Sequence, residues 1–234
     1  MGADTKDQEG QTALKTLETI LFPHLNQCHI CKRGLPPLQG VILCDGCMEE
    51  LRRCQRNGEM CLDFGHEPLD VAVSAYQYAD ITGRLVRRLK YHGDSSVAQL
   101  LSIGMCAAYA KGKERIGDAE LIVPVPSHYT AIVRRGYNQA YYLAQVMTEH
   151  LGIPMEANAL IKSRAVASLV GQTREARRKA VDKAFAVQRR GLIEGKRVLL
   201  IDDVLTSGAT ASSCGKALLL AGATHVSVLT ACHA

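Results

Sequence analysis

The stretch VLLIDDVLTSGAT, residues 198–210, decides the fold of this chain of 234 residues. Its first four residues are Val, Leu, Leu and Ile and predict a buried strand, which ends in two adjacent acids, Asp202 and Asp203. A short loop rich in hydroxyl groups follows, and a helix is predicted to begin at about Ala209. Ligands of parallel α/β sheets bind at the carboxyl ends of the strands. The stretch therefore predicts a ligand site between a strand and a helix.

This loop has the features of a phosphate site. A helix N-terminus offers unpaired N–H groups and a positive dipole end, and glycine lets the backbone approach an anion closely. The predicted phosphate- and ribose-binding residues are Thr206, Ser207, Gly208, Ala209 and Thr210. We expect Asp202 and Asp203 to be the catalytic acids, because ribose hydroxyls are suitable donors for two carboxylates beside a phosphate. The loop is neither a Walker A nor a Gly-x-Gly-x-x-Gly loop, and the alternative is an ordinary strand followed by a capped helix.

Strands and helices alternate along most of the chain. This order, with short connections, predicts an α/β fold in which helices flank a parallel sheet. The predicted strands are residues 71–78, 121–125, 184–187, 198–201 and 226–231, and the predicted helices are residues 12–21, 82–91, 95–110, 138–151 and 209–220.

A cysteine cluster precedes this pattern. Two Cys-x2-Cys pairs are separated by twelve residues, and four thiolates in a tetrahedron suit a structural zinc ion. The predicted metal ligands are Cys28, Cys31, Cys44 and Cys47. The alternatives are reduced structural cysteines or a redox pair, and His24 or His29 could replace one ligand. The spacing of Cys54, Cys61 and His66 is poor for a second site.

The distribution of residue types along the chain predicts its domain organisation. We expect a tail and short helix in residues 1–22, a zinc-ribbon-like module in residues 23–68, and the α/β domain in residues 69–234.

Apolar residues make up 47% of the chain, enough for a sizeable core, and the net charge of +5 permits a phosphate or nucleic-acid partner without requiring one. The polar start predicts no signal peptide, and no apolar run is long enough for a membrane span, so we expect a cytoplasmic protein.

The loop at 198–210 closely resembles the phosphoribosyl-pyrophosphate signature of type I phosphoribosyltransferases. The wider layout resembles the ComF family, in which a domain of this kind follows a zinc module. The matching segments are Leu21–Pro23, Leu85–Tyr91 with Gly93 and Asp94, Val123–Pro126, Arg135–Ala140 and Ala184–Phe185.

The resemblance implies a diphosphate site opposite the acids. Its implied pyrophosphate-binding residues are Pro126, Ser127, Arg134, Arg135, Asn138 and Arg177. A basic loop at 174–179 is the implied closing loop, and Mg²⁺ would accompany the diphosphate. Arg134 and Arg135 could equally form a solvated basic turn. The basic helix face that ends at Lys90 and Tyr91 could likewise simply face solvent.

Three functions remain open at this point. The first is phosphoribosyl transfer from phosphoribosyl pyrophosphate to an acceptor that the sequence does not name. The second, implied by the resemblance, is a non-catalytic factor that binds nucleotides or single-stranded DNA and works with DNA-uptake proteins in natural transformation. Tyrosines at 91, 137, 141 and 142 could stack on bases there. The third is a regulator that senses phosphoribosyl pyrophosphate.

Overall fold

The computed structural model describes residues 27–36, 41–56, 60–62, 69, 71–127, 129–162 and 184–234. The chain divides into two compact units, Met1–Arg53 and Cys54–Ala234. This division lies upstream of the boundary expected at residue 68, because β1 (Met60–Leu62) pairs antiparallel with β2 (Val71–Gln77) of the larger unit. The helix expected at 12–21 lies outside the described residues.

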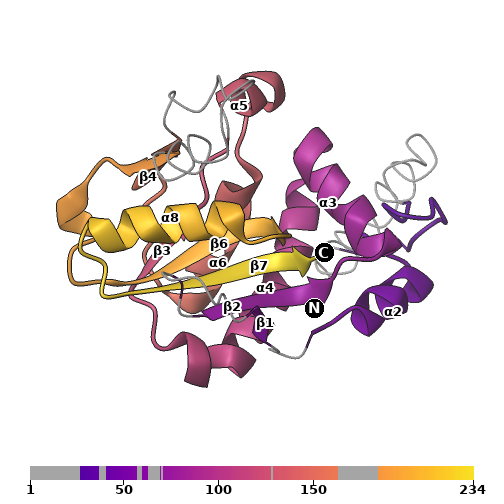
Figure 1. Ribbon diagram of the computed structural model, residues 1–234. Coiled ribbons are helices and arrows are strands. Elements are labelled where there is room, and N and C mark those ends of the chain that lie inside the picture. The colour runs from indigo at the N-terminus through magenta and orange to yellow at the C-terminus, as the bar shows by residue number, and fades with distance from the viewer. Residues whose placement is uncertain are drawn as a thin grey trace, which may run out of the picture. The chain divides into compact units, whose positions relative to one another are not determined.

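A five-stranded sheet forms the centre of the larger unit, in the order β1-β2-β7-β6-β3 (Figure 1). The remaining strands are β3 (Leu121–Pro124), β6 (Arg197–Leu205) and β7 (His225–His233). Strands β2, β7, β6 and β3 are all parallel. The predicted α/β class with a parallel sheet is therefore confirmed.

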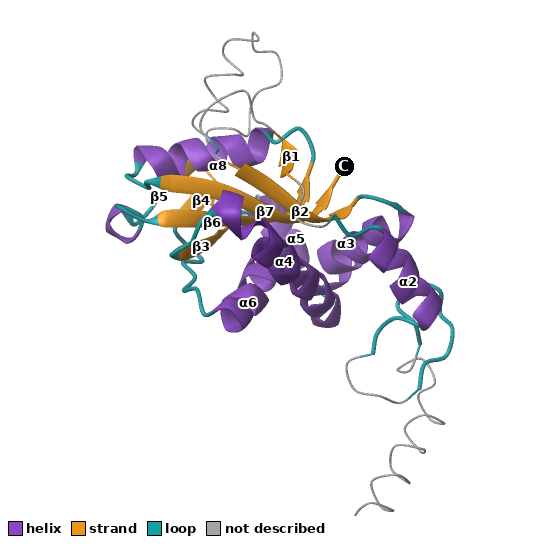
Figure 2. Cartoon of the chain, turned by 90° about the horizontal axis from the view of Figure 1, so that it is seen from below, coloured by secondary structure: helices purple, strands orange, loops and turns teal. Residues whose placement is uncertain are grey.

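Helices cover both faces of this sheet, and Figure 2 shows α8 on one side of the strands and α4 and α6 on the other. Helix α4 packs on β2 and β7, α6 on β3 and β6, and α8 on β6 and β7. The helices are α3 (Asp80–His92), α4 (Ser95–Ile116), α5 (Tyr129–Arg135), α6 (Gln139–Leu151) and α8 (Ala209–Leu220). A small antiparallel pair, β4 (Leu160–Lys162) and β5 (Phe185–Val187), and a short 3-10 helix (Arg190–Leu192) complete the unit.

Strand β6 is buried on both faces, which explains its continuous apolar run. Val198 and Leu200 belong to the core cluster that contains Cys214 and Leu218 of α8. Successive side chains of a strand point to opposite faces, so Leu199 belongs to the face that α4 and α6 cover. The observed strand runs to Leu205, beyond the predicted end at Ile201, and therefore includes both acids.

The smaller unit contains a tight turn and a helix. Gln27 and Gly34 form an isolated bridge around the first cysteine pair, and Cys28 N–H donates to the Arg33 carbonyl at 2.8 Å. Helix α2 (Asp45–Arg53) begins directly after Cys44 and buries Cys47 and Leu51. In the parts of both units that the structure describes, no helix combines the length and the apolar character needed to cross a bilayer.

Candidate functional site

The two acids of β6 point to opposite faces of the sheet. The Asp202 side chain points to the same face as Leu200, which is the face that α8 covers. The Asp203 side chain points to the other face, where Lys90 of α3 contacts it. Asp203 is only 3% exposed, whereas Asp202 is partly exposed. The Asp203 backbone N–H donates to Asp202 Oδ1 at 2.8 Å. Two residues that are neighbours in sequence thus have different surroundings.

Asp203 forms an ion pair with Lys90 of α3. The Lys90 Nζ lies 2.8 Å from Asp203 Oδ2, and the lysine side chain is 26% exposed. The angles of this contact fall outside hydrogen-bond geometry, and within the described residues Oδ2 has no hydrogen-bond partner. The carboxylate therefore has its charge compensated but keeps the capacity to accept a hydrogen bond from a ligand.

Asp202 has an unusual protonation equilibrium. Withdrawal of its carboxyl group from water raises its pKa well above the usual value, and the negative charge of Asp203 raises it further. The amide of Asp203 and the more distant Lys90 act in the opposite direction. The pair is consequently asymmetric: Asp203 is compensated by a cation, and Asp202 tends to hold a proton.

The loop after β6 leads into an uncapped helix. Gly208, at the N-cap of α8, has φ 74° in the left-handed region, and among the described residues no side-chain hydrogen bond caps this helix start. The first-turn amides of this helix are therefore available to an anion. Thr206, Ser207 and Thr210 are exposed around them.

A cavity of about 580 Å³ lies at this end of the sheet. Among the predicted site residues, its lining includes Asp202, Asp203, Thr206, Thr210, Pro126, Ser127 and Arg135. Ser207, Gly208, Ala209, Arg134 and Asn138 are outside this lining, and Arg177 lies outside the described residues. Further lining residues, for which the sequence analysis proposed no site role or left one open, are Tyr78, Arg87, Lys90, Tyr91, Gln139 and Lys162.

Asn138 organises the loop that follows β3. Its Oδ1 accepts from Ala140 N–H at 3.1 Å as the N-cap of α6, and from the Ser127 hydroxyl at 2.9 Å. Its Nδ2 donates to the Val125 carbonyl at 2.9 Å. Asn138 thus connects the Pro126–Ser127 wall of the cavity to the start of a helix.

The end of α3 and the turn before α6 hold each other in place. The Tyr137 hydroxyl donates to the Leu89 carbonyl at 2.8 Å. Gly93, with φ 60°, lies against the Tyr137 ring, and a Cβ there would be 3.0 Å from Tyr137 Cε1. The Arg135 guanidinium lies 5.1 Å from the centre of the Tyr91 ring. Two motifs that are distant in sequence therefore build one wall of the cavity.

A second cavity of about 620 Å³ lies beyond Pro126, Ser127 and Lys162, which line both cavities. Tyr137, Tyr141 and Tyr142 line the second one. The rings of Tyr137 and Tyr142 are 5.4 Å apart between centroids, and Tyr141 contacts Tyr142 edge-on at 6.1 Å. A cavity lined by tyrosines thus adjoins the cavity that contains the acid pair.

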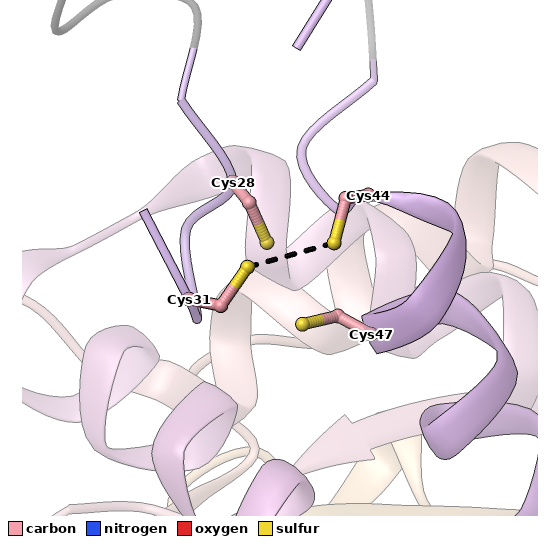
Figure 3. A group of neighbouring side chains, drawn as sticks. All are labelled: Cys28, Cys31, Cys44 and Cys47. Carbon is pink, nitrogen blue, oxygen red and sulfur yellow. Dashed lines mark hydrogen bonds between the residues drawn. The ribbon is translucent and has the colours of Figure 1, made fainter. Parts of the chain in front are cut away.

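The four predicted metal ligands of the smaller unit lie together. Their sulfur atoms are all within 4.8 Å of one another, and Figure 3 shows the four thiols pointing toward a common centre. Four sulfurs around a zinc ion at about 2.3 Å would be about 3.8 Å apart, so the group could hold such an ion. Burial opposes ionisation of Cys28, but N–H groups of the cluster backbone outweigh it and lower its pKa to about 6. Burial and the other three thiols raise the pKa of Cys47.

An acid pair and a hydroxyl-rich loop at the end of a parallel strand define a phosphoribosyltransferase-like α/β protein. In the sequence, a cysteine module precedes this α/β domain.

Three relatives span nearly the whole chain. Competence protein F of Haemophilus influenzae is 29% identical over 86% of this chain and 90% of its own length. DNA utilization protein YhgH of Escherichia coli K12 is 25% identical, covering 92% and 93%. Competence protein ComFC of Bacillus subtilis is 24% identical, covering 87% and 82%. These three similarities support the resemblance to the ComF family.

Two other comparisons add less. No family model matches the chain. The solved glutamine phosphoribosylpyrophosphate amidotransferase of B. subtilis is 25% identical to this chain, with a TM-score of 0.41. The match covers 57% of this chain and 26% of the amidotransferase chain, so this chain spans about a quarter of that structure. Adenine phosphoribosyltransferase of Thermoanaerobacter pseudethanolicus is 12% identical with a TM-score of 0.40, covering 80% of this chain and 99% of that one.

Proposed function

We propose that the larger unit binds phosphoribosyl pyrophosphate or a related ribose 5-phosphate in the 580 Å³ cavity. The observation that carries this proposal is the common lining of one cavity by both acids, by Thr206 and Thr210, and by Ser127. The first-turn amides of α8 and the threonine hydroxyls would hold the 5-phosphate. The two acids would accept hydrogen bonds from the ribose hydroxyls.

In the enzymatic form of this proposal, the ribose is transferred to a nucleophilic nitrogen. The nitrogen attacks C1, the bond from C1 to the diphosphate oxygen breaks, and the nitrogen releases its proton to water. Arg135 and Lys162, which line the cavity, would stabilise the charge that the leaving diphosphate gains. Mg²⁺ would enter with the diphosphate as part of the substrate.

Calorimetry with phosphoribosyl pyrophosphate and Mg²⁺ tests the binding. Changing Asp202→Asn together with Asp203→Asn removes both carboxyl acceptors and should weaken binding at least about tenfold, since a hydrogen bond to a charged group contributes about 1.5–3 kcal/mol. The charge-matched control is Asp80→Asn with Asp118→Asn, because both side chains are largely exposed and neither lines the cavity. Equal affinities of the two double variants would refute the proposal.

Transfer is tested separately from binding. Pyrophosphate release is measured with a panel of amines and nitrogen heterocycles as acceptors. Release that depends on an acceptor and disappears in the double Asn variant supports the enzyme. Tight binding without release under every acceptor supports a non-catalytic sensor of the same ligand.

We further propose that the cysteine cluster holds a structural zinc ion. Four thiolate ligands leave no open coordination position for water, so the ion would stabilise the smaller unit and take no part in catalysis. Mass spectrometry under native conditions should find one zinc per chain, and loss of zinc on changing Cys44→Ser is the expected control.

A second candidate function is binding of single-stranded DNA, and one relative is named a DNA utilization protein. The observation that favours it is that the cavity lined by tyrosines adjoins the cavity that contains the acid pair. Filter binding over a salt series should give a steep salt slope. Tyr141→Ala should lose about 1–3 kcal/mol of DNA affinity if a base stacks there. DNA affinity that survives both this change and the double Asn change would place the DNA surface elsewhere.

A further inference from the structure

We infer that Lys90 is a positioning residue for the acid pair: its ammonium forms an ion pair with the buried carboxylate of Asp203 and holds it in the cavity lining, where it accepts hydrogen bonds from ligand hydroxyl groups. The ion pair of Lys90 and Asp203 stands on the protein alone, and its consequence for ribose binding rests on the proposed function. The sequence leaves open whether Lys90, at the end of a basic helix, faces solvent.

The first argument is burial. A carboxylate that is 3% exposed is costly to ionise without a partner, and the Lys90 Nζ at 2.8 Å supplies that partner. Because β6 side chains alternate between faces, the ion pair involves Asp203 and leaves Asp202 on the α8 side. One lysine therefore makes two neighbouring acids different.

The second argument is rigidity on both sides of Lys90. The preceding residue, Leu89, is fully buried, and its carbonyl accepts the hydrogen bond of Tyr137. Beyond the helix end, Gly93 packs on the same tyrosine ring. Arg88 adds an ion pair of 2.8 Å to Asp94, the N-cap residue of α4. The lysine thus extends from a helix end that is anchored at three points.

The third argument concerns the other charged and titratable groups around the pair. These are Arg87 of α3, Arg135 of α5, Lys162 of β4, Cys214 of α8 and Cys232 of β7. Burial and then the charge of Asp203 raise the pKa of Cys232 to about 12, and burial also raises that of Cys214. Both thiols are therefore neutral near pH 7. The charged groups around Asp203 are then Asp202 and these cations. Among them, Lys90 forms an ion pair with Asp203.

Removal of the Lys90 charge leaves the buried Asp203 carboxylate without its ion-pair partner. Truncating one partner of a buried pair is costly, because the other charge is then buried and uncompensated. The loss should be smaller when Asp203 is also made neutral, since no unpaired carboxylate then remains. Lys90→Arg keeps the charge and should largely preserve the native stability.

The experiment is a double-mutant cycle on the full-length chain, in which urea unfolding is measured for Lys90→Met, for Asp203→Asn and for both changes together. The double variant should lose less stability than the sum of the two single variants, because the two side chains stabilise each other. Arg84→Met with Asp203→Asn is the matched control cycle and should be additive, because Arg84 belongs to the same helix but lies outside the cavity lining. Additive losses in the Lys90 cycle would overturn the inference, and Lys90→Gln replaces Lys90→Met if the methionine variant does not fold.

Binding of ribose 5-phosphate supplies the second measurement. Lys90→Met should weaken binding at least about tenfold because the acceptor carboxylate is no longer held in place, and Lys90→Arg should restore most of the affinity. Native affinity in Lys90→Met would overturn the inference, and an equal loss in Lys90→Arg would indicate a merely structural role and would overturn it too. If the native chain binds no ribose 5-phosphate at all, the proposed function fails, while the double-mutant cycle still decides the role of Lys90.

Discussion

At the residue scale, the alternation of side chains along β6 has the largest consequence for the site. Asp202 and Asp203 are adjacent, but a strand directs them to opposite faces, toward α8 and toward α3. One acid meets a lysine at 2.8 Å and the other has a raised pKa. The pair is therefore better described as one carboxylate in an ion pair with lysine and one carboxyl group with a raised pKa than as two equal ligands.

The raised pKa of Asp202 predicts a pH dependence of stability. The unfolded carboxyl loses its proton near pH 4, whereas the folded one keeps it to higher pH, so the unfolded state binds fewer protons in between. Stability contributed by this group is thus lost as the pH rises from about 4 to the folded pKa, by at most about 1.4 kcal/mol per pH unit. Urea unfolding of the larger unit should show this loss, and Asp202→Asn should remove it. A native stability that is parallel to that of the variant over this range would contradict the prediction.

Gly208 predicts a second residue-level effect. Gly208→Ala forces an L side chain to φ 74° and should cost about 1–2 kcal/mol of unfolding free energy. Gly152→Ala is the control, because its φ of 68° is similar, a Cβ there has open space, and it lies at the end of α6 rather than at the start of α8. Both variants should lose stability in denaturant titrations, but only Gly208→Ala should also weaken ribose 5-phosphate binding. Equal ligand affinities would argue against an anion at the start of α8.

At the scale of elements, the cavity depends on two helix ends that contact each other. The end of α3 and the turn before α6 are separated by more than forty residues, as in the bond from Tyr137 to Leu89 with a sequence separation of 48. On one side of this contact, Lys90 lines the cavity. On the other side, Asn138 accepts a hydrogen bond from the Ser127 hydroxyl. The wall opposite the acids is thus a product of helix docking.

Tyr137→Phe tests this docking. Loss of the hydroxyl leaves the Leu89 carbonyl without its partner and should lower the unfolding free energy by about 1–3 kcal/mol. Tyr141→Phe, at a tyrosine that is 36% exposed, should change it by less than about 0.5 kcal/mol. Thermal and urea unfolding measure both values. Similar stabilities of the two variants would show that the contact contributes little.

Packing of α4 on the sheet gives a further element-level prediction. A Cβ on Gly104 would collide with the hydroxyl of the buried Tyr76 of β2, so Gly104→Ala should cost about 1–3 kcal/mol through overpacking. Gly191→Ala, where a Cβ has open space, is the control and should be nearly neutral. The measurement is again denaturant unfolding, and a neutral Gly104→Ala would mean that α4 can shift away from β2 at no cost.

At the scale of the whole molecule, the division into two units predicts separable stabilities. Among the residues of the smaller unit that the structure describes, the large buried side chains besides the cysteines are Ile30, Ile42, Leu43 and Leu51. We therefore expect a metal ion to supply much of the stability of this unit, and chelation to unfold it. The larger unit has its own sheet and core and should keep its structure. Hydrogen exchange before and after chelation should show lost protection in α2 alone, and loss in β6 or β7 as well would contradict this independence.

The sequence by itself determined the local features. The run at 198–201, the two acids and the glycine at 208 specify a strand, a turn and a helix start, because these depend on propensity and periodicity within a few residues. The spacing of the four cysteines likewise specifies one cluster, since a Cys-x2-Cys turn brings its own thiols together.

Only the tertiary structure decided which distant groups meet. The Lys90–Asp203 pair, the Tyr137–Leu89 bond and the antiparallel addition of β1 each join segments whose separate patterns carry no sign of the partner. Side-chain packing over long sequence separations sets these contacts, and a local pattern of charge or apolarity is compatible with many partners. For this reason the sequence leaves open whether Lys90 faces solvent, whereas the fold makes it the counter-ion of a buried acid.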